Sequence, residues 1–520
     1  MLVLSFRYIA FLGLCGVLHY IYCHRRRRLF PLPPSLPGWP LVGNAFQLPL
    51  KYVHIFYQEL ERKLGSKIMY VEAFGQPIVV VNDACIASDL LEKRSALYSS
   101  RPRQPMLVEV IGSKQFFGLL PYGDEWRNHR RIFQQHFSTK SLAREREIIL
   151  RFLRKGLLPN LYQNPQGFHD HVQGFVGGFS LSMTYGLPVR RNDDPLIHIS
   201  DVGFKAVVEA ASPGRYLVNI VPILQHFPSW LPGMGFKQEA REARKQLDQL
   251  LEEPYQITRR NMEEGAYQES FVSASIENHQ GQPDYNMHEL HIKQAACQIF
   301  GAATETTAAS VTTFILAMLL NPDVQRKAQR EVDAVVGSDR FPEFSDEPEL
   351  PYLSAVLKET LRWNPTAPIG IAHLTSADDV YEGYFIPKGT AVMANAYAML
   401  QDEEVFPNPK EFRPDRFIKD GALVKDVLDP MVVATFGFGR RMCPGSHIAL
   451  SALYIAAASI LSLFDISPAL DANNNPIEVK PEFCVASLVS EPKPFLCKFI
   501  PRHGKDVKGL LSDYLGIEVL

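Results

Sequence analysis

The chain lacks the residue patterns of several common protein classes. Its seven cysteines among 520 residues are scattered, odd in number and form no Cys-X-X-Cys pair or Cys/His cluster. This excludes a disulfide framework and a zinc site of ordinary spacing. No Asn-X-Ser/Thr acceptor with a non-proline middle residue occurs, which fits a body that stays in the cytosol. Neither charge sign dominates, since 54 basic residues face 56 acidic ones, so nucleic acid is not an expected partner.

Beyond residue 50 the sequence also lacks internal repeats and any low-complexity linker long enough to separate two domains. Length alone would suggest two or three domains, but 46% hydrophobic residues can build one large core. Helical periodicity dominates, and strand-like alternation is confined to Lys67–Asn82, which suggests a hairpin, and Val380–Ala398. We therefore expect a mainly α body with a minor β-sheet portion.

Residues 1–23 are apolar apart from Arg7 and His19, and a basic cluster, His24–Arg28, follows at once. About 20 apolar residues suffice to cross a bilayer, and the basic cluster should remain on the cytosolic side. A cleaved signal peptide is the alternative, but its charges would precede the apolar core. We interpret residues 1–23 as a single transmembrane signal anchor and the basic, proline-rich residues 24–44 as a stiff hinge.

Residues 288–320 have the pattern of one long helix, whose apolar part could be mistaken for a second membrane span. Glu305 and six threonines or serines make that interpretation costly, so a buried central helix is expected instead. Asn321 is predicted to cap a further helix that begins at Pro322. Phe236–Gly265 is amphipathic and charge-rich, which is typical of a surface helix.

A lone cysteine follows a glycine-rich turn in the segment Phe436-Gly-Phe-Gly-Arg-Arg-Met-Cys-Pro-Gly445. The apolar run 446–459 after it has the pattern of a helix. Backbone N–H groups at a helix N-terminus favour a thiolate, and a thiolate can ligate a metal. The simpler alternative is a buried structural cysteine, the commonest role of a lone cysteine.

The positions Phe436, Gly439, Arg441, Cys443 and Gly445 closely resemble the haem loop of the cytochrome P-450 family. The resemblance implies the cytochrome P-450 fold and a haem b cofactor. It also implies that Cys443 is the axial ligand of the haem iron, while Phe436 and Arg441 contact the haem.

The segment 300–307 resembles the oxygen-activation motif of the same family. By that match Thr306 would hydrogen-bond to dioxygen and Glu305 would relay protons to it. The sequence departs from the family at Ala303, where glycine is usual. A structural explanation for Thr306 is also available, because threonine can bond to the carbonyl four residues earlier and bend a helix.

Two further arginine-containing motifs match the family in the expected order along the chain. Glu359 and Arg362, with Arg416 downstream, resemble the buried charge network that shapes the haem loop, a structural role. The second motif, Trp126-Arg-Asn-His-Arg130, resembles the WxxxR helix of the family, which implies that Trp126 and Arg130 reach a haem propionate. Arg441 and His373 are the remaining candidates, since buried propionates must be neutralised. Ordinary packing with a solvated charge is the simpler alternative.

The resemblance places a catalytic domain at residues 45–505 and a tail at 506–520, on the endoplasmic reticulum membrane. It implies a monooxygenase that inserts one oxygen atom from O2 into a small lipophilic substrate, by hydroxylation or epoxidation. The sequence is similar to fungal microsomal enzymes of secondary metabolism, for example of terpenoid biosynthesis. Four apolar stretches are candidate substrate contacts: Met106–Leu120, Phe204–Phe236, Pro368–Ile371 and Val485–Leu488.

The sequence contains no dinucleotide or flavin fingerprint, and no reductase domain fits after residue 500. We therefore expect a separate NADPH-cytochrome P-450 reductase to supply electrons, with cytochrome b5 as a further possible partner. Two alternatives remain at this point. They are a haem-thiolate isomerase or dehydratase that does not use O2, and a non-catalytic membrane haem-binding protein.

Overall fold

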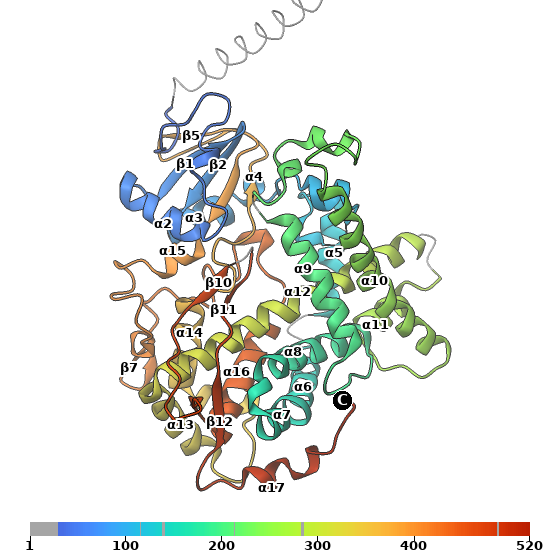
Figure 1. Cartoon of the computed structure of the whole chain (residues 1–520), viewed down its shortest axis with the longest axis vertical. Helices are drawn as coiled ribbons and strands as arrows, with labels where there is room; N and C mark the ends of the chain where they lie inside the picture. The colour runs from blue at the N-terminus through green and yellow to red at the C-terminus, as the bar shows by residue number, and fades with distance from the viewer. Residues whose placement is uncertain (1–29, 115, 138–140, 213, 282–284, 486–487) are drawn as a thin grey trace, which may run out of the picture.

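The computed structural model describes residues 30–520, except 115, 138–140, 213, 282–284 and 486–487. The described part is mainly helical with several small β-sheets, as predicted (Figure 1). The longer helices are α2 (Val53–Leu64), α5 (Asp124–His136), α6 (Leu142–Phe152), α8 (Phe168–Tyr185), α9 (Pro195–Ala211), α10 (Phe236–Glu263), α11 (Phe271–His279), α12 (Tyr285–Leu320), α13 (Pro322–Val336), α14 (Pro351–Trp363) and α16 (Ser446–Leu463). The short ones are α3 (Ala84–Ser88), α4 (Ser95–Tyr98), α7 (Leu158–Gln163), α15 (Ala396–Leu400) and α17 (Val507–Leu511).

The strands are short and form one four-stranded sheet and several two-stranded pairs. They are β1 (Ile68–Ala73), β2 (Gln76–Val81), β3 (His373–Leu374), β4 (Asp379–Tyr381), β5 (Tyr384–Ile386), β6 (Ala391–Ala394), β7 (Ile418–Lys419), β8 (Ala422–Leu423), β9 (Phe464–Pro468), β10 (Phe483–Val485), β11 (Ser490–Pro492) and β12 (Cys497–Pro501).

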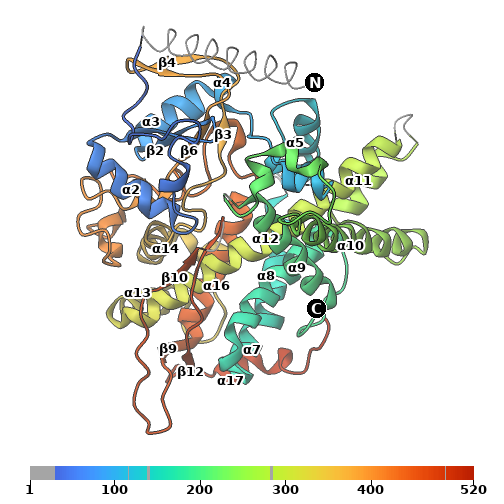
Figure 2. The ribbon, with the colours of Figure 1, turned by 45° about the horizontal axis from the view of Figure 1, so that its top comes forward.

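The long helix α12 runs through the middle of the molecule and packs against α5, α8, α9 and α16 (Figures 1 and 2). Helices α12 and α16 are long and apolar enough to span a membrane, but both are mostly buried inside the chain. Their apolar surface is therefore covered by protein, as predicted for the long segment. Hydroxyl groups in α12 are satisfied locally, since Thr304 donates to the Phe300 carbonyl at 3.0 Å and Thr313 to Ala309 at 2.7 Å.

The larger sheet has the strand order β1-β2-β6-β3. Strands β1 and β2 form the predicted hairpin, with register from Ile68↔Val81 to Ala73↔Gln76. Their turn holds Phe74 and Gly75, both with positive φ. Strand β6 runs parallel to β2, so the distant segment Ala391–Ala394 completes the sheet beside the hairpin.

Both ends of the described chain lie against the body. In the predicted hinge, the Pro31 and Pro34 carbonyls accept backbone N–H groups of Phe385 and Tyr70. The tail returns to the segment after α8, where Leu520 and Val189 exchange backbone hydrogen bonds. The predicted anchor at residues 1–23 and the start of the hinge lie outside the described residues.

Two local predictions were wrong. Asn321 precedes α13 but makes no capping bond with its side chain, which instead donates to the Ala317 carbonyl of α12. The stretch predicted as strand up to Ala398 turns helical at Ala396, where Asn395 caps α15 by accepting the Ala398 N–H. In both places a nearby carbonyl or N–H competes with the local pattern.

Candidate active site

The cysteine loop, residues 436–445, directly precedes α16 and contains the buried residue Phe438. Gly437 and Gly439 both have positive φ, and a Cβ on Gly439 would overlap the backbone carbonyl of Leu91. The Cys443 N–H donates to the Phe436 carbonyl at 2.9 Å and closes the loop. The predicted glycine-rich turn before Cys443 is therefore present.

The Cys443 side chain lies deep in the molecule but is accessible, so it borders an internal cavity. Burial raises the pKa of the Cys443 thiol, whereas the N–H of Gly445 and the charge of Arg130 lower it. Both of these groups stabilise a thiolate. The arrangement suits a sulfur ligand of a metal bound inside the cavity.

A stripe of partly accessible residues interrupts the buried surface of α12. It recurs at helical spacing and comprises Ile299, Ala302, Ala303, Thr306 and Ser310. Such a stripe in the middle of a core helix faces internal space rather than bulk solvent. The Thr306 hydroxyl donates to the Ala302 carbonyl at 2.8 Å, which leaves its oxygen lone pairs free to accept.

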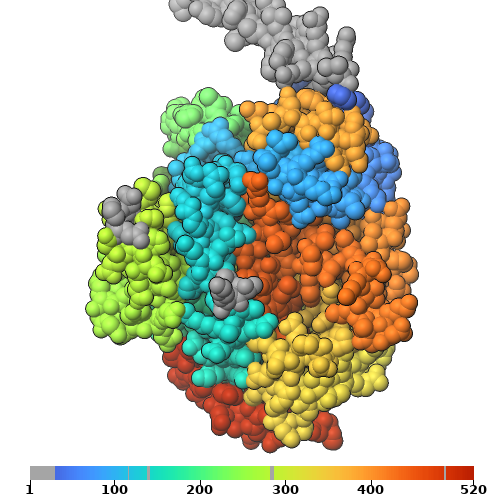
Figure 3. Space-filling view, turned by 180° about the vertical axis from the view of Figure 1, so that it is seen from behind, coloured from blue at the N-terminus to red at the C-terminus, as the bar shows by residue number. Residues whose placement is uncertain are grey.

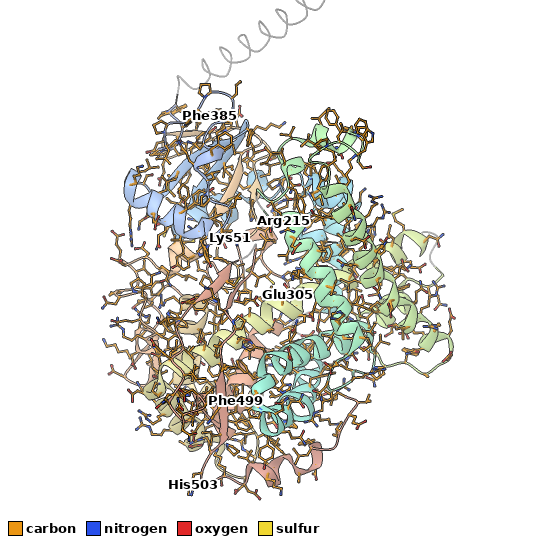
Figure 4. All side chains as sticks on the ribbon, viewed as in Figure 1. Lys51, Arg215, Glu305, Phe385, Phe499 and His503 are labelled. Carbon is orange, nitrogen blue, oxygen red and sulfur yellow. The ribbon has the colours of Figure 1, made fainter. Side chains whose placement is uncertain are left out.

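Glu305 is partly buried beside this stripe, at the middle of the molecule (Figure 4). Burial raises the pKa of Glu305 to about 7, and the charges of Asp201 and Glu491 act in the same direction. A carboxyl group with this pKa both takes up and releases protons near neutral pH.

Arg441 of the cysteine loop is buried against Trp126 of α5, with its guanidinium carbon 4.7 Å from the indole centroid. Its Nη2 donates to the Gly118 and Leu120 carbonyls at 2.9 and 2.8 Å. Burial and the charge of Arg130 lower the pKa of Arg441 to about 9.

His373 and Arg101 lie beside Arg441. His373 donates from Nδ1 to the Tyr98 carbonyl at 2.6 Å, which leaves Nε2 free, and burial lowers its pKa. Arg101 is buried and donates only to backbone carbonyls, those of Gly118, Ile371 and Ala372. Its charge acts on His373, and the charge of Arg441 acts on it.

The sequence prediction omitted Arg101. It precedes Pro102 in an ordinary-looking loop, and no spacing relative to the other motifs marks it. Only its burial next to Arg441 identifies it as part of this cation cluster.

Among the described residues, no carboxylate lies within ion-pair distance of Arg101, Arg441 or Arg130. Arg130 donates instead to the Met442 carbonyl at 2.9 Å. Buried cations without a counter-charge are costly, so their convergence indicates a bound anion. The two carboxylates of haem, with its iron at the Cys443 thiol, fit this donor set. The predicted roles of the individual residues stay predictions.

Behind the loop, the predicted charge network is formed entirely by buried groups. Arg362 holds Glu359 through two hydrogen bonds of 2.7 and 2.9 Å, and Arg416 adds one of 3.1 Å. Arg362 also donates to the carbonyls of Leu400 and Pro409. The network therefore ties α14 to the chain that leads into the cysteine loop.

A cleft of about 660 Å³ opens on the outer side of the loop. Residues near 130 and near 440 lie against each other on this face (Figure 3). The lining is mainly basic and amide, from Tyr122, Trp126, Arg127, Arg130, Arg131, Gln134, Gln135, Gly439 and Arg440.

Comparison with known proteins identifies the family. The cytochrome P450 family model matches residues 33–499. A cytochrome P450 monooxygenase of Armillaria gallica is 38% identical over 94% of this chain and 95% of its own length. The cytochrome P450 monooxygenase ple1 of Rhodocybe pseudopiperita is 40% identical over 94% and 92%. The tryptamine 4-monooxygenase of Psilocybe cyanescens is 36% identical over 96% and 98%.

These relatives are named monooxygenases, which favours that activity over the isomerase and the non-catalytic alternative. The family also implies a haem cofactor, a small-molecule substrate and a redox partner. The chain therefore belongs to the cytochrome P450 family and is a haem-thiolate monooxygenase, an oxidoreductase that incorporates oxygen from O2.

Proposed function

We propose that this monooxygenase hydroxylates or epoxidises a small lipophilic compound of fungal secondary metabolism, with terpenoids as the leading class. Electrons come from NADPH through a separate membrane-bound reductase. The observation that carries the proposal is the accessible Cys443 thiol beside buried arginines that have no carboxylate partner in the described chain. When bound, a haem with a cysteinate ligand supplies the redox chemistry that activates O2.

The protein's own residues hold the cofactor and move protons. Cys443 is the proposed iron ligand, and Phe436 packs at the cofactor. The propionates are neutralised by Trp126, His373 and Arg441, which are buried, and by Arg130, which is partly buried; Arg101 is added on structural grounds.

On the side of the cavity opposite Cys443, the Thr306 hydroxyl oxygen has lone pairs with which it accepts a hydrogen bond from a group bound in the cavity. Glu305 exchanges protons with the cavity, because its pKa of about 7 permits both protonation states.

The substrate pocket is proposed to be apolar and to lie between three elements. Phe116, from the predicted stretch Met106–Leu120, lies 6.2 Å from Phe204 of α9, measured between ring centroids. Phe204 in turn packs against Gly301 of α12. Two segments predicted to contact substrate thus meet at α12, at a residue that adjoins the cavity stripe in sequence. Apolar walls with few polar groups favour lipophilic ligands.

An exposed apolar surface supports attachment to the endoplasmic reticulum membrane. Large apolar side chains are exposed in two segments: Trp39 and Leu41 are 66% and 95% exposed, and Trp230 is 79% exposed. Leu50 contacts Gly214, which brings the first segment beside the chain between α9 and α10. Exposed patches of this kind mark interaction or membrane surfaces.

Brominated lipids in nanodiscs should quench tryptophan fluorescence of the full chain, and Trp230→Phe should remove part of that quenching. Equal quenching in the variant would argue against contact at this surface.

The basic cleft beside the cysteine loop is the proposed docking site of the reductase, and of cytochrome b5 if it takes part. Arg127, Arg130, Arg131 and Arg440 give this surface a positive charge, and Asp124 pairs with only one of them. Positive surfaces steer acidic partners, and high salt weakens that steering. Electron transfer should therefore slow as ionic strength rises.

The function is tested by reducing the purified protein under carbon monoxide and looking for the thiolate-type Soret band. Cys443→Ser should abolish the band, whereas Cys85→Ser, an exposed cysteine outside the site, should keep it. With reductase, NADPH and O2, untargeted mass spectrometry of a fungal metabolite extract should then find an oxygenated product. A wild-type protein without the band would refute the proposal.

Thr306→Ala should keep the band but release more peroxide per NADPH oxidised. Thr304→Ala is the matched control, because Thr304 makes the same bond to a carbonyl four residues earlier but is fully buried. An equal peroxide yield in both variants would contradict the role of Thr306.

A further inference from the structure

Glu305 has ionisable neighbours that come from elements far apart in the sequence. Helix α9 contributes Asp201 and Lys205, and strand β11 contributes Glu491. Figure 4 shows Glu305 on α12, in the region where α9 and β11 also lie. The charges of Asp201 and Glu491 raise the pKa of Glu305, and that of Lys205 lowers it. Glu305 is therefore one member of a coupled group.

The packing of α9 on α12 places Asp201 near Glu305. Phe204 of α9 lies against Gly301 of α12, where a Cβ on the glycine would be 3.4 Å from the phenylalanine ring. Asp201 precedes Phe204 by about one turn, and Glu305 follows Gly301 by about one turn. Both carboxyl groups thus lie about one turn from the same helix contact, and they lie on the same side of it, because the charge of Asp201 acts on Glu305.

The two carboxylate oxygens of Asp201 differ in their surroundings. The side chain accepts a hydrogen bond from Gln173 of α8, but Oδ1 is buried and has no partner among the described residues. Buried polar atoms normally have partners, so an unpaired one needs an explanation. Burial also raises the pKa of Asp201 to about 6. An unpaired oxygen on such a group is available to receive a proton.

The surface end of this arrangement is His198, one turn before Asp201 on α9. Its imidazole is exposed, and its charge lowers the pKa of Asp201. The side chain of His198 is exposed and that of Asp201 is partly buried. Glu305 is also partly buried and lies beside the stripe that faces the cavity. Imidazole is a common proton shuttle, so an exposed histidine at this position can pass protons from solvent to Asp201.

We propose that Asp201 relays protons from His198 at the surface to Glu305 at the cavity. The inference rests on the proposed role of Glu305 in proton delivery. The imidazolium of His198 loses a proton to the Asp201 carboxylate, directly or through water. Protonated Asp201 gives its proton to the Glu305 carboxylate and regains its negative charge, while solvent reprotonates His198. No electrons move in these steps.

A rival route would run through Glu491, which is exposed and also raises the pKa of Glu305. Burial raises the pKa of Glu491 and Lys205 lowers it. Six charged or polar groups can therefore influence a pH series on this part of the protein: Gln173, His198, Asp201, Lys205, Glu305 and Glu491.

The first test is independent of turnover. Infrared difference titration of the full-length haem protein between pH 5 and 8 follows the band of protonated carboxyl groups, and Glu305→Gln assigns the part due to Glu305. Asp201→Asn should move the Glu305 midpoint to lower pH, because a neighbouring negative charge is gone. Glu209→Gln is the matched control on α9, since Glu209 pairs with Arg215 at 3.0 Å and is not coupled to Glu305. An unchanged midpoint in Asp201→Asn would overturn the proposal.

The second test measures NADPH-driven oxygen reduction with reductase in H2O and D2O, which needs no identified substrate. General acid catalysis is worth about 10²–10⁴-fold, so Asp201→Asn should slow the reaction about tenfold or more and raise its solvent isotope effect. Asp201→Glu should restore most of the rate if the carboxyl group matters. His198→Ala should be rescued by a high concentration of a non-coordinating buffer acid.

The proposal would be overturned if Asp201→Asn kept the wild-type rate and isotope effect. It would also be overturned if Glu491→Gln slowed the reaction and Asp201→Asn did not. The carbon monoxide band of each variant shows that the fold is intact. A wild-type protein that forms no oxygenated product would refute the proposed function, while the infrared titration would still decide whether Asp201 and Glu305 are coupled.

Discussion

Glu359 carries four hydrogen bonds in a position with no exposure, which makes its removal a severe perturbation. Arg362 donates from Nε and Nη2, Arg416 from Nε, and the backbone N–H of Arg413 adds a bond of 2.7 Å. The Glu359 and Arg362 side chains have no exposed surface, and that of Arg416 is 5% exposed. Glu359→Ala would leave two buried guanidinium groups without their carboxylate.

Breaking a buried ion pair by removing one partner destabilises proteins by about 3–5 kcal/mol. Large domains shift their unfolding midpoint by roughly 2 °C per kcal/mol, so Glu359→Ala should lower the midpoint by about 6–10 °C. Glu359→Gln keeps the shape but loses the charge and turns an N–H₂ group toward the arginine donors. It should therefore also be destabilising.

The assay is thermal unfolding of the haem-loaded protein, followed by far-UV circular dichroism and by the Soret band. Asp323→Ala is the matched control, because Asp323 and Arg326 have the same i,i+3 spacing on α13 but are 91% and 63% exposed. Exposed pairs contribute about 0–1 kcal/mol, so this variant should shift the midpoint by no more than about 2 °C. If Glu359→Ala falls within the same range, burial does not decide the strength of this network.

Three further predictions concern the site. Gly439→Ala should lose the thiolate-type Soret band, because a Cβ there overlaps a neighbouring carbonyl in addition to the strain of its positive φ. Gly437→Ala has only the strain of a positive φ, about 1–2 kcal/mol, and no overlapping atom, so it should keep the band; loss in both variants would contradict this. Arg441→Met should release haem to apomyoglobin about tenfold faster, since a charge-assisted bond is worth about 1.5–3 kcal/mol, and Arg440→Met should not. Because the pKa of Glu305 is raised in the folded protein, the folded state binds a proton at Glu305 more tightly than the unfolded state. The stability that this contributes is present below pH 4.5 and is lost as pH rises to about 7. Glu305→Gln should therefore gain stability relative to wild type between pH 5 and 8, by at most about 3 kcal/mol, and an unchanged difference in unfolding midpoint would refute it.

Features governed by local sequence could be predicted well. The hairpin around Gly75, the buried helix containing Glu305 and the turn before Cys443 depend on neighbouring residues, so periodicity and glycine placement were enough. The pairing of Glu359 with Arg362 also follows from i,i+3 spacing. The local errors at Asn321 and the start of α15 arose where two hydrogen-bonding arrangements compete.

Features that depend on contacts between distant segments could not be predicted from pattern alone. Arg101 joins the site because the loop before α5 and the segment at Ile371 meet around it. Asp201 and Glu491 approach Glu305 from a helix and a strand that lie about 100 and 190 residues away in the sequence. Neither position carries a spacing signal, since the relevant distance is between elements.

The buried arginines should affect the stability of the fold and its affinity for haem in opposite directions. Arg101 and Arg441 are held by backbone carbonyls, which satisfy their hydrogens but do not neutralise their charge. Burial disfavours the charged forms and therefore lowers the pKa of both groups. A ligand with two carboxylates at these groups would remove this penalty, and it would bind only the folded chain. We therefore expect haem binding and stability to be linked, with the side chains that are costly to bury contributing to the affinity for haem.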